Sequence, residues 1–321
     1  MREMTIGKND AGQRLDKFLQ KALPSLPPSL MHKYVRLKRI KCNGKRCQTS
    51  ARLTEGDVLS LYINDEFFQP VKEEEAFRRI TPRLHILYED DHILLCDKRP
   101  GMVVHEDDQG TLDTLINHIK AYLYEKGEWD PDKEQSFTPA LCNRIDRYTG
   151  GIVMAAKTAE GLRVLNEKIR LHQVQKFYLC LVHGTPSPRQ AVIQDTLLKD
   201  SKQNQVRVVK KNTPGARTAS MSYKVLQSRG KLSLVECELF TGRTHQIRVQ
   251  MSHRGWPLVG DTKYGTMERN RPYGMTHQAL YSYKLHFSQE GDWGELSYLK
   301  GKTFQVEDVP FLPFFYNQSK N

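Results

Sequence analysis

The sequence predicts an α+β protein in two parts, a small N-terminal unit and a large mixed unit that begins near residue 81. Three observations lead to this fold class. The chain has 321 residues, a length typical of about two domains. Apolar residues recur at helical spacing in some stretches and form strand-length runs in others. Hydrophobic residues make up 38% of the chain, which excludes disorder of the low-hydrophobicity kind.

The chain is strongly basic, and the charge is concentrated toward its N-terminal end. It carries 49 Lys and Arg residues against 37 Asp and Glu, a formal net charge of +12. Between Lys17 and Thr54 there are ten basic residues and no acidic one. Such a local field attracts phosphate and indicates an anionic partner, most simply nucleic acid. A solvated basic face without a partner is the alternative.

Several classes of protein are poor fits. The N-terminal stretch MREMTIGKNDAG lacks the apolar segment of a signal peptide, and no apolar run approaches the roughly 20 residues of a membrane span. Of six scattered cysteines only Cys42 and Cys47 lie close together, without the second pair that a zinc site needs. We therefore expect reduced cysteines, no metal, no membrane partner and a cytoplasmic location.

Residues 1–65 are predicted to form a small folded unit. Apolar residues at 15–23 have helical spacing, and the prolines that follow end this helix. A second short helix from Leu30, a strand that enters an Asn43-Gly44 hairpin turn and a strand at 58–63 complete the unit. The second helix is expected to carry the basic residues Lys33, Arg36, Lys38 and Arg39, and the hairpin is expected to carry Lys45.

Residues 66–80 are predicted to be a linker, because Pro70 and the acidic run Glu73–Glu75 break the periodicity. Residues 81–321 are predicted to form one large mixed unit. Its expected elements, in order, are a strand at 93–98, a helix at 111–124, a loop at 125–138, a strand at 152–157, a helix at 158–171 and strands at 176–184 and 232–239.

Two features of the large unit each permit two interpretations. The polar, basic stretch 185–219 either follows an RNA backbone or forms an exposed hairpin of solvated charges. Tyr178, in the strand at 176–184, is suited to stack on a base. A tyrosine of the sheet or core is the commoner role for a single Tyr in a strand.

A first dense cluster of polar residues centres on Asp146, which lies between Arg144 and Arg147 and ahead of Gly150-Gly151. Cationic neighbours favour the ionised form of a carboxyl group. A carboxylate in a cleft beside such groups can act as a nucleophile or as a base. A structural salt bridge in a loop explains the same pattern, so these residues alone leave both interpretations open.

A second dense cluster begins at Thr241 with the sequence Thr-Gly-Arg-Thr-His-Gln-Ile-Arg. Thr244 is the expected N-cap of a helix, and Gly255 is its expected end. A Gly-Arg-Thr turn into a helix suits a phosphate or a carboxylate, although a plain helix start is the alternative. Arg248 lies one turn inside this helix, where it pairs with Asp146 if the two segments meet.

These motifs occur together in the order of a known family. Segments Arg14–Leu19, Ile40–Lys45 and Leu53–Ile63 resemble an S4 RNA-binding domain, although Pro27–His32 stands where a Ser-Arg start of the second helix is usual. Further along come N-R-I-D-R-x-T-G-G, K-x-Y-x-x-x-V-x-G, T-G-R-T-H-Q-I-R-V and P-L-V-G-D-x-x-Y-G. The chain resembles an RluA-type RNA pseudouridine synthase with an N-terminal S4 domain, over nearly its whole length.

The resemblance implies a mixed, largely antiparallel β-sheet catalytic domain with flanking helices, a small α/β S4-like domain before it, and a cleft that holds Asp146. It implies isomerisation of uridine to pseudouridine in RNA, without cofactor or metal. Asp146 matches the catalytic aspartate, Tyr178 the tyrosine that stacks on the target base, and Arg248 the basic partner of the aspartate. The resemblance also assigns Arg144 to holding the flipped nucleotide and Ile247 to lining the base pocket. Arg147 is a further candidate for substrate binding, and Lys157 and Arg243 are expected to contact phosphates.

One departure from the family pattern is Asn143, which replaces the usual His before the Arg-Ile-Asp core. That His is not the nucleophile, so we expect activity to survive and the local hydrogen bonds to differ. The expected substrate is large-subunit (23S) ribosomal RNA or a pre-ribosomal particle, with tRNA as the alternative. The expected acting species is a monomer.

Two other functions compete with the isomerase. A base-releasing N-glycosidase also uses a carboxylate near C1′, but it sets free uracil. A non-catalytic ribosome-assembly factor binds RNA through the S4-like unit and performs no chemistry. The presence of Asp146, Tyr178 and Arg248 favours the isomerase. The target uridine is not set by the sequence, nor is the choice between attack of Asp146 on C1′ and removal of a C2′ proton.

Overall fold

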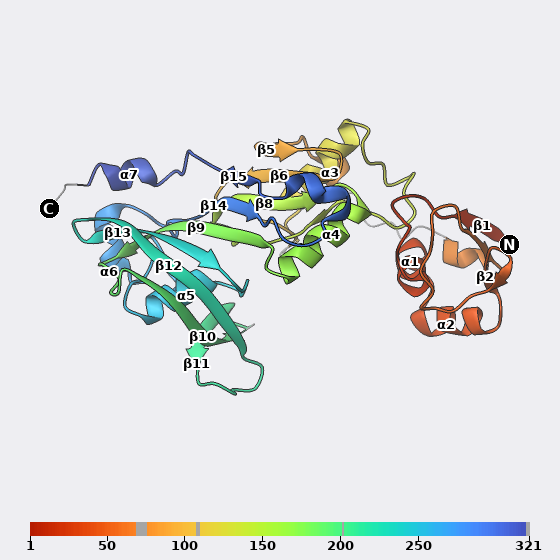
Figure 1. Ribbon diagram of the computed structural model, residues 1–321, viewed down its shortest axis with the longest axis horizontal. Coiled ribbons are helices and arrows are strands. Elements are labelled where there is room, and N and C mark those ends of the chain that lie inside the picture. The colour runs from red at the N-terminus through yellow and green to blue at the C-terminus, as the bar shows by residue number, and fades with distance from the viewer. Residues whose placement is uncertain (69–75, 107–109, 201, 319–321) are drawn as a thin grey trace.

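The computed structural model describes residues 1–68, 76–106, 110–200 and 202–318, which form two β-sheets of different size (Figure 1). A four-stranded sheet comes first in the chain, and an eleven-stranded sheet follows. Helices pack against both sheets, which confirms the predicted α+β class.

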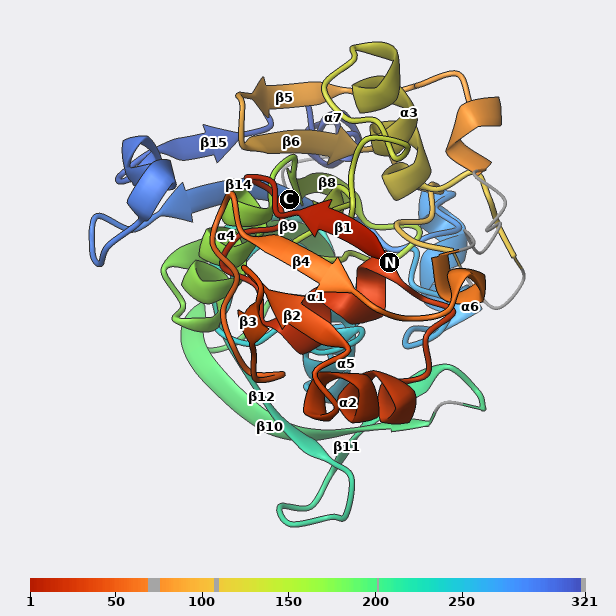
Figure 2. The same cartoon turned by 90° about the vertical axis from the view of Figure 1, so that its right-hand side faces the viewer.

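In the small unit, the strands follow the order β1-β4-β2-β3; α1 lies behind this sheet in Figure 2, and α2 lies below it. The predicted first helix is confirmed as α1 (Leu15–Ala22). Its residues Leu15, Phe18 and Leu19 are fully buried, because the helical spacing places them all on the side that faces the sheet. The strands are β1 (Arg2–Thr5), β2 (Ile40–Cys42), β3 (Lys45–Arg46) and β4 (Val58–Leu61).

The second helix, α2 (Pro28–Arg36), begins and ends earlier than predicted. Pro28 opens it, because the fixed φ of proline suits the first turn. The helix ends before Lys38, whose φ of 61° is left-handed. The expectation that Lys38 and Arg39 lie on this helix is therefore wrong. The chain turns at Lys38 because the next strand must bring Ile40, which is fully buried, into the core.

The predicted hairpin turn is confirmed. Asn43 and Gly44 have φ values of 51° and 70°, and a type I′ turn needs positive φ at both central residues. The Asn43 side chain also ties the turn to β4. Its Nδ2 donates to Asp57 Oδ1 at 2.8 Å, and its Oδ1 accepts from the backbone N–H of Val58 at 2.8 Å.

The predicted linker is described only in part, since Pro70 and Glu73–Glu75 lie outside the described residues. Short 3-10 helices flank this gap, η1 (Asp65–Phe68) and η2 (Ala76–Arg79). Phe77 of η2 is buried in the large unit, where its ring centroid lies 5.2 Å from that of Trp129. The chain is thus packed on the large unit from η2 onward.

The large sheet has the order β11-β10-β12-β13-β9-β14-β8-β6-β5, with β15 beside β14 and β7 beside β8. Strands β14 and β8 are parallel, and the other pairs within the described ranges are antiparallel. This is the mixed, largely antiparallel sheet that the resemblance implies. The strands are β5 (Ile86–Glu89), β6 (Ile93–Lys98), β7 (Ala140–Leu141), β8 (Gly150–Ala156), β9 (Val174–His183), β10 (Gln190–Asp200), β11 (Gln205–Val209), β12 (Arg217–Arg229), β13 (Leu232–Leu239), β14 (Leu280–Phe287) and β15 (Thr303–Gln305).

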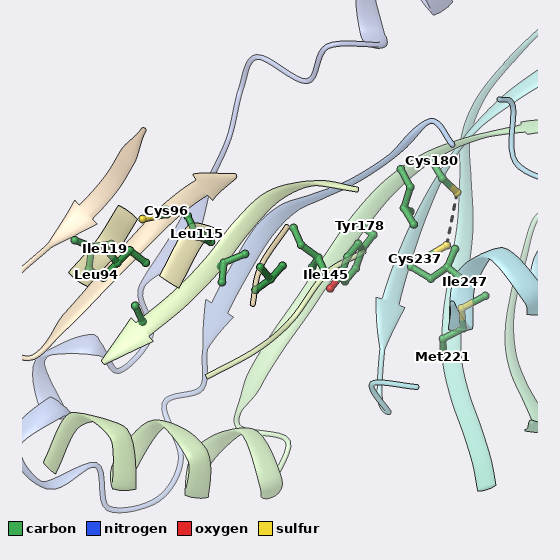
Figure 3. Packing of buried hydrophobic residues seen from close by; sticks show 14 of the residues in the cluster. Leu94, Cys96, Leu115, Ile119, Ile145, Tyr178, Cys180, Met221, Cys237 and Ile247 are labelled. Carbon is green, nitrogen blue, oxygen red and sulfur yellow. Dashed lines mark hydrogen bonds between the residues drawn. The ribbon is translucent and has the colours of Figure 1, made fainter. Parts of the chain in front are cut away.

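Helices cover both faces of this sheet. Because side chains alternate along a strand, Leu94 and Cys96 of β6 join the core that α3 and α5 cover (Figure 3), while Ile93 and Leu95 join the core beneath α4. All four side chains are almost completely buried. The helices are α3 (Leu115–Glu125), α4 (Ala159–Arg170), α5 (Gln246–His253), α6 (Met267–Asn270) and α7 (Leu312–Tyr316), with the 3-10 helices η3 (Arg271–Tyr273) and η4 (Gly294–Leu299).

Two stretches of the large unit refine the sequence prediction. Helix α3 begins at Leu115 instead of 111, because Thr114 caps it by accepting a hydrogen bond from the N–H of Asn117. The basic stretch 185–219 contains a β-hairpin, in which β10, β11 and the start of β12 extend away from the centre of the sheet (Figures 1 and 2). This geometry is compatible with both interpretations of its charges.

Polar contacts hold the small unit against the large one. The buried carboxylate of Asp10 accepts a hydrogen bond from Ser136 Oγ at 2.5 Å. Gln13 Nε2 donates to the same hydroxyl at 2.9 Å. On α4, Arg163 Nη1 donates to the carbonyl of Ala11 at 2.6 Å. Because these contacts come from two separate segments of the large unit, they restrain rotation of the small unit as well as its distance.

A glycine in β8 should be indispensable for the centre of the large sheet. In the parallel pairing, Gly151 lies opposite Ser282 of β14, and a Cβ on Gly151 would overlap the Ser282 backbone at a φ of 111°. We expect Gly151→Ala to lower the free energy of unfolding by about 3 kcal/mol or more, measured by urea denaturation. Gly230→Ala, at φ 54° in open space, should cost only about 1–2 kcal/mol. Equal losses in the two variants would contradict the close approach of β14 and β8.

Candidate active site

Asp146 lies in the loop between β7 and β8, directly after Ile145, which belongs to the apolar core of Figure 3. The preceding residue, Ile145, is buried in that core and anchors the loop. Asn143 fastens the same loop to β8, because its Oδ1 accepts a hydrogen bond from the backbone N–H of Met154 at 2.7 Å. The Asp146 side chain stays 26% exposed, so its carboxylate is open to a ligand.

Lys98, at the end of β6, fixes the backbone next to Asp146. Its side chain is buried, and Nζ donates to the carbonyls of Met102 and Arg147, both at 2.9 Å, and of Arg99 at 3.1 Å. Burial lowers the pKa of Lys98 to about 8, against the opposing charge of Asp146. The sequence analysis missed this residue, because a lysine that ends an apolar strand carries no sign of what it binds.

Arg248 of α5 meets Asp146, as the sequence analysis proposed. Arg248 Nη1 lies 3.0 Å from Asp146 Oδ2, while Nε and Nη2 bind the two carboxylate oxygens of Asp261 at 2.7 and 3.0 Å. The Arg248 side chain is only 8% exposed. Burial by itself lowers the pKa of Arg248, but the hydrogen bonds and charges of Asp261 and Asp146 outweigh it and raise that pKa.

Asp261 is the residue of this network that the sequence analysis missed. It is completely buried, and its Oδ1 also accepts the backbone N–H groups of Lys263 and Tyr264 at 2.9 and 3.1 Å. The fork of two parallel bonds fixes the plane of the Arg248 guanidinium. The motif P-L-V-G-D contains Asp261, yet a motif does not reveal which side chain lies opposite it.

The start of α5 differs from the prediction. His245, with φ 52° and ψ 22°, is the N-cap residue, and no side chain caps the helix. The expectation that Thr244 is the cap is wrong. The side chain of Gln246, and not that of Thr244, accepts hydrogen bonds from the polar groups of this turn. Its Oε1 accepts from Arg243 N at 3.0 Å and from Thr241 Oγ1 at 2.7 Å. The predicted end is confirmed, since Gly255 follows the helix with a left-handed φ of 85°.

His245 is a second residue that faces the carboxylate and that the sequence analysis did not single out. Its Nε2 lies 3.9 Å from Asp146 Oδ2, and its Nδ1 lies 2.7 Å from the hydroxyl of Tyr264. Burial lowers the pKa of His245 to about 4. The Tyr264 ring also lies against Arg248, with the guanidinium carbon 5.2 Å from the ring centroid.

An apolar wall adjoins the carboxylate. Tyr178 and Ile247 are 6% and 3% exposed, and both belong to the buried cluster that also contains Ile145 (Figure 3). The register places Tyr178 opposite Ser282 of β14, so β9 and β14 align this ring with the start of β8. Burial raises the pKa of Tyr178 to about 12, so its hydroxyl is neutral at physiological pH.

The three arginines predicted to bind substrate lie around this centre and differ in their exposure to solvent. Arg144 and Arg147 are exposed on either side of Asp146. Arg147 Nε donates to the carbonyl of Gly101 at 3.1 Å. Arg243, just before α5, is half-buried and donates from Nε to the carbonyl of Thr218 at 3.0 Å.

Lys157 is not brought to this centre. It follows β8 at the end away from Asp146, about 20 Å along the strand from Gly150. Its ammonium group is buried and lies 2.8 Å from Glu89 and 2.5 Å from Glu128. The expectation that Lys157 contacts a phosphate needs correction, because both of these carboxylates already compensate its charge.

The small unit presents the basic surface that its sequence predicts. Five basic side chains of α2, the turn that follows it and the β2–β3 hairpin are exposed there. They are Lys33, Arg36, Lys38, Arg39 and Lys45. The basic charge between Lys17 and Thr54 therefore faces solvent at these positions, where an anionic partner can reach it.

The described residues offer neither a metal cluster nor a membrane-spanning helix. They contain no group of three or more His, Cys, Asp and Glu side chains arranged to hold a metal ion. All six cysteines are free thiols, with Cys180 and Cys237 in contact at 4.0 Å between sulfurs. No helix among these residues is long and apolar enough to cross a membrane.

Comparison with known sequences finds two family matches in this chain. The family described as RNA pseudouridylate synthase matches residues 92–253, and the S4 domain matches residues 13–59. "Ribosomal large subunit pseudouridine synthase C" of Escherichia coli (strain K12) is 32% identical over 305 residues, which cover 90% of this chain and 89% of that protein. The protein of the same name from Vibrio parahaemolyticus is 31% identical, with 81% and 79% covered.

Solved structures agree on the fold. "Human RNA Pseudouridylate Synthase Domain Containing 1" is 21% identical and superposes with a TM-score of 0.54, covering 74% of this chain and 89% of that one. "Human RNA Pseudouridylate Synthase Domain Containing 4" is 21% identical, with a TM-score of 0.55 and 72% and 90% covered. The large sheet and its flanking helices therefore have the pseudouridine synthase fold.

The buried fork on Arg248 should make Asp261 important for stability. In Asp261→Ala the Arg248 guanidinium loses two of its three hydrogen bonds while it remains buried. We expect the free energy of unfolding to fall by about 3–5 kcal/mol, measured by urea denaturation. Asp65→Ala removes the exposed partner of Arg2 and should cost less than about 1 kcal/mol. A similar small loss in Asp261→Ala would mean that the fork does not hold Arg248.

Proposed function

Since this chain belongs to the RNA pseudouridylate synthase family, we propose that it converts uridine to pseudouridine in large-subunit (23S) ribosomal RNA, with Asp146 as the catalytic carboxylate. The observation that carries the assignment of Asp146 is its ion pair with the buried Arg248, 3.0 Å away, beside the apolar wall of Tyr178 and Ile247. A carboxylate for chemistry at the sugar and an apolar surface for the base thus lie together.

The reaction exchanges one bond for another. The N1–C1′ bond breaks and uracil leaves with the electron pair, the base turns, and a C5–C1′ bond forms. The proton lost from C5 balances the proton gained at N1, so the mass of the RNA does not change. Asp146 acts on the ribose, either by attack on C1′ or by removal of a proton from C2′. Both routes require its ionised form, which the Arg248 guanidinium favours.

The apolar wall is the proposed site of the base. The target uridine must leave its stack to reach Asp146, at a cost of a few kcal/mol. A tyrosine ring that stacks on the base offsets part of this cost, and Tyr178 is the buried tyrosine beside the carboxylate. Ile247 lines the pocket. Arg144, exposed two residues before Asp146, occupies the gap that the flipped nucleotide leaves.

The proposed substrate follows from the relatives and the charge. The proteins from Escherichia coli and Vibrio parahaemolyticus are named for the large ribosomal subunit, and the exposed basic residues of the S4-like unit suit a large structured RNA. A transfer RNA is the alternative substrate. We propose that the enzyme acts as a monomer in the cytoplasm, because one chain supplies both the carboxylate and the base pocket and ribosomal RNA lies in that compartment.

The role of Asp146 can be tested with Asp146→Asn. Arg248 keeps its fork with Asp261 in this variant, so we expect the fold and the affinity for RNA to persist. Turnover should fall by at least about 10⁴-fold, because an amide neither attacks C1′ nor takes a proton from C2′. Formation of pseudouridine in a 23S fragment, followed by carbodiimide labelling and primer extension, measures this.

Asp132→Asn is the matched control, since Asp132 also bonds an arginine, Arg78, but is 75% exposed. This control should retain the wild-type rate. A wild-type rate in Asp146→Asn would remove Asp146 from the chemistry. Release of free uracil by the wild-type enzyme, with loss of RNA mass, would replace the isomerase by the glycosidase.

The substrate can be identified in cells that lack this gene. We expect specific uridines of 23S ribosomal RNA to lose the modification, and the purified enzyme to restore it, because the exposed basic unit suits a large RNA. Mapping of pseudouridines in total RNA measures the change. Loss confined to tRNA would overturn the ribosomal assignment and keep the reaction. Unchanged maps with persistent RNA binding would favour an assembly factor.

A further inference from the structure

His245 has a strained backbone at the edge of the candidate active site. Its φ of 52° and ψ of 22° are left-handed, a region that favours glycine. The side chain is 9% exposed and Nε2 lies 3.9 Å from Asp146 Oδ2. Residues other than glycine usually keep a left-handed backbone only where the surrounding structure holds them in place. The tautomer of the imidazole decides whether Nε2 directs an N–H group or a lone pair at this carboxylate.

The hydrogen bonds of Tyr264 identify the tautomer of His245. The Tyr264 oxygen accepts the backbone N–H of Val206 at 2.9 Å and lies 2.7 Å from His245 Nδ1. Within the described residues His245 Nδ1 is the acceptor available to the Tyr264 proton. If Tyr264 donates to Nδ1, the imidazole proton lies on Nε2 and faces Asp146. The opposite tautomer would direct the lone pair of Nε2 at a carboxylate, which is repulsive.

The surroundings of His245 keep it uncharged. Burial lowers its pKa to about 4, and the charges of Arg248 and Lys263 act in the same direction. Asp146 and Asp261 oppose this shift without reversing it. A histidine with this pKa is neutral throughout the physiological range, so it offers Asp146 a neutral N–H and not a second positive charge.

We propose that His245 is a positioning residue for Asp146, held by the Tyr264 hydroxyl as the Nε2–H tautomer so that its N–H is directed to Oδ2. This inference rests on the proposed function of Asp146. Arg248 donates to the same oxygen, and no described side chain donates to Oδ1. Oδ1 is therefore the oxygen that reacts with the ribose. The gap of 3.9 Å closes when substrate binds, as catalytic hydrogen bonds often do.

The tautomer can be measured without any reaction. In the full-length protein labelled with ¹⁵N-histidine, the signals of His245 are those that disappear in His245→Gln. At pH 7 we expect Nε2 to carry the proton and Nδ1 to be unprotonated, with no titration between pH 5 and 8. Tyr264→Phe should mix the two tautomers, because Nδ1 loses its donor. A proton on Nδ1, or titration in this range, would overturn the proposal.

Kinetics on the same RNA fragment test the positioning role. We expect kcat to fall about 10- to 100-fold in His245→Gly, a loss typical for supporting residues around a reacting group, while KM changes little. Glycine accepts the left-handed backbone, so this variant loses the N–H without adding strain. His245→Gln, whose side-chain amide also ends in an N–H group, should recover much of the rate.

His172 offers a matched control, since it is left-handed at φ 57° but exposed, in the turn after α4. His172→Gly should keep the wild-type kcat. A wild-type kcat in His245→Gly, or no recovery in His245→Gln, would overturn the positioning role. If the wild-type protein makes no pseudouridine, the proposed function fails, while the measured tautomer still reports on His245. The two failures are thus distinguishable.

Discussion

One buried guanidinium organises the centre of this molecule. Arg248 binds both oxygens of Asp261, 13 residues further along the chain, and one oxygen of Asp146, 102 residues before it, so three separate segments meet at one side chain. A buried arginine must be compensated, and Asp261, with no exposed surface, supplies most of that compensation. Asp146 is consequently free to remain partly exposed. Asp261 thus fixes the orientation of the Arg248 guanidinium, and the charge of that guanidinium favours the ionised form of Asp146.

The large sheet determines where this centre lies. β8 is the parallel neighbour of β14, and the close approach of Gly151 to Ser282 brings the loop of Asp146 next to the strand that faces Tyr178. Lys98 holds the carbonyl of Arg147 from the neighbouring strand. The loop is therefore fixed from both sides, and the carboxylate has a defined position before any RNA binds. In the proposed reaction, such preorganisation lowers the free-energy cost of reaching the transition state.

The small unit is also held in a defined position relative to Asp146. Asp10 and Arg163 help to hold it at a defined place on the large unit, and its exposed basic residues are carried along. Under the proposed function, a basic surface at a defined distance from Asp146 favours RNAs that bind both places at once.

The sequence by itself determined the elements and the chemistry they carry. Helical spacing found α1, apolar runs found β6 and β8, and the motifs indicated the family and singled out Asp146, Tyr178 and Arg248 as candidates, because these signals are local in the chain. Local signals also misled: Lys38 and Arg39 leave their helix, Thr244 does not cap α5, and Lys157 lies at the far end of β8. Only the tertiary structure decided which charges meet. Asp261, Lys98 and His245 owe their places to strand register and burial, which depend on residues far away in sequence.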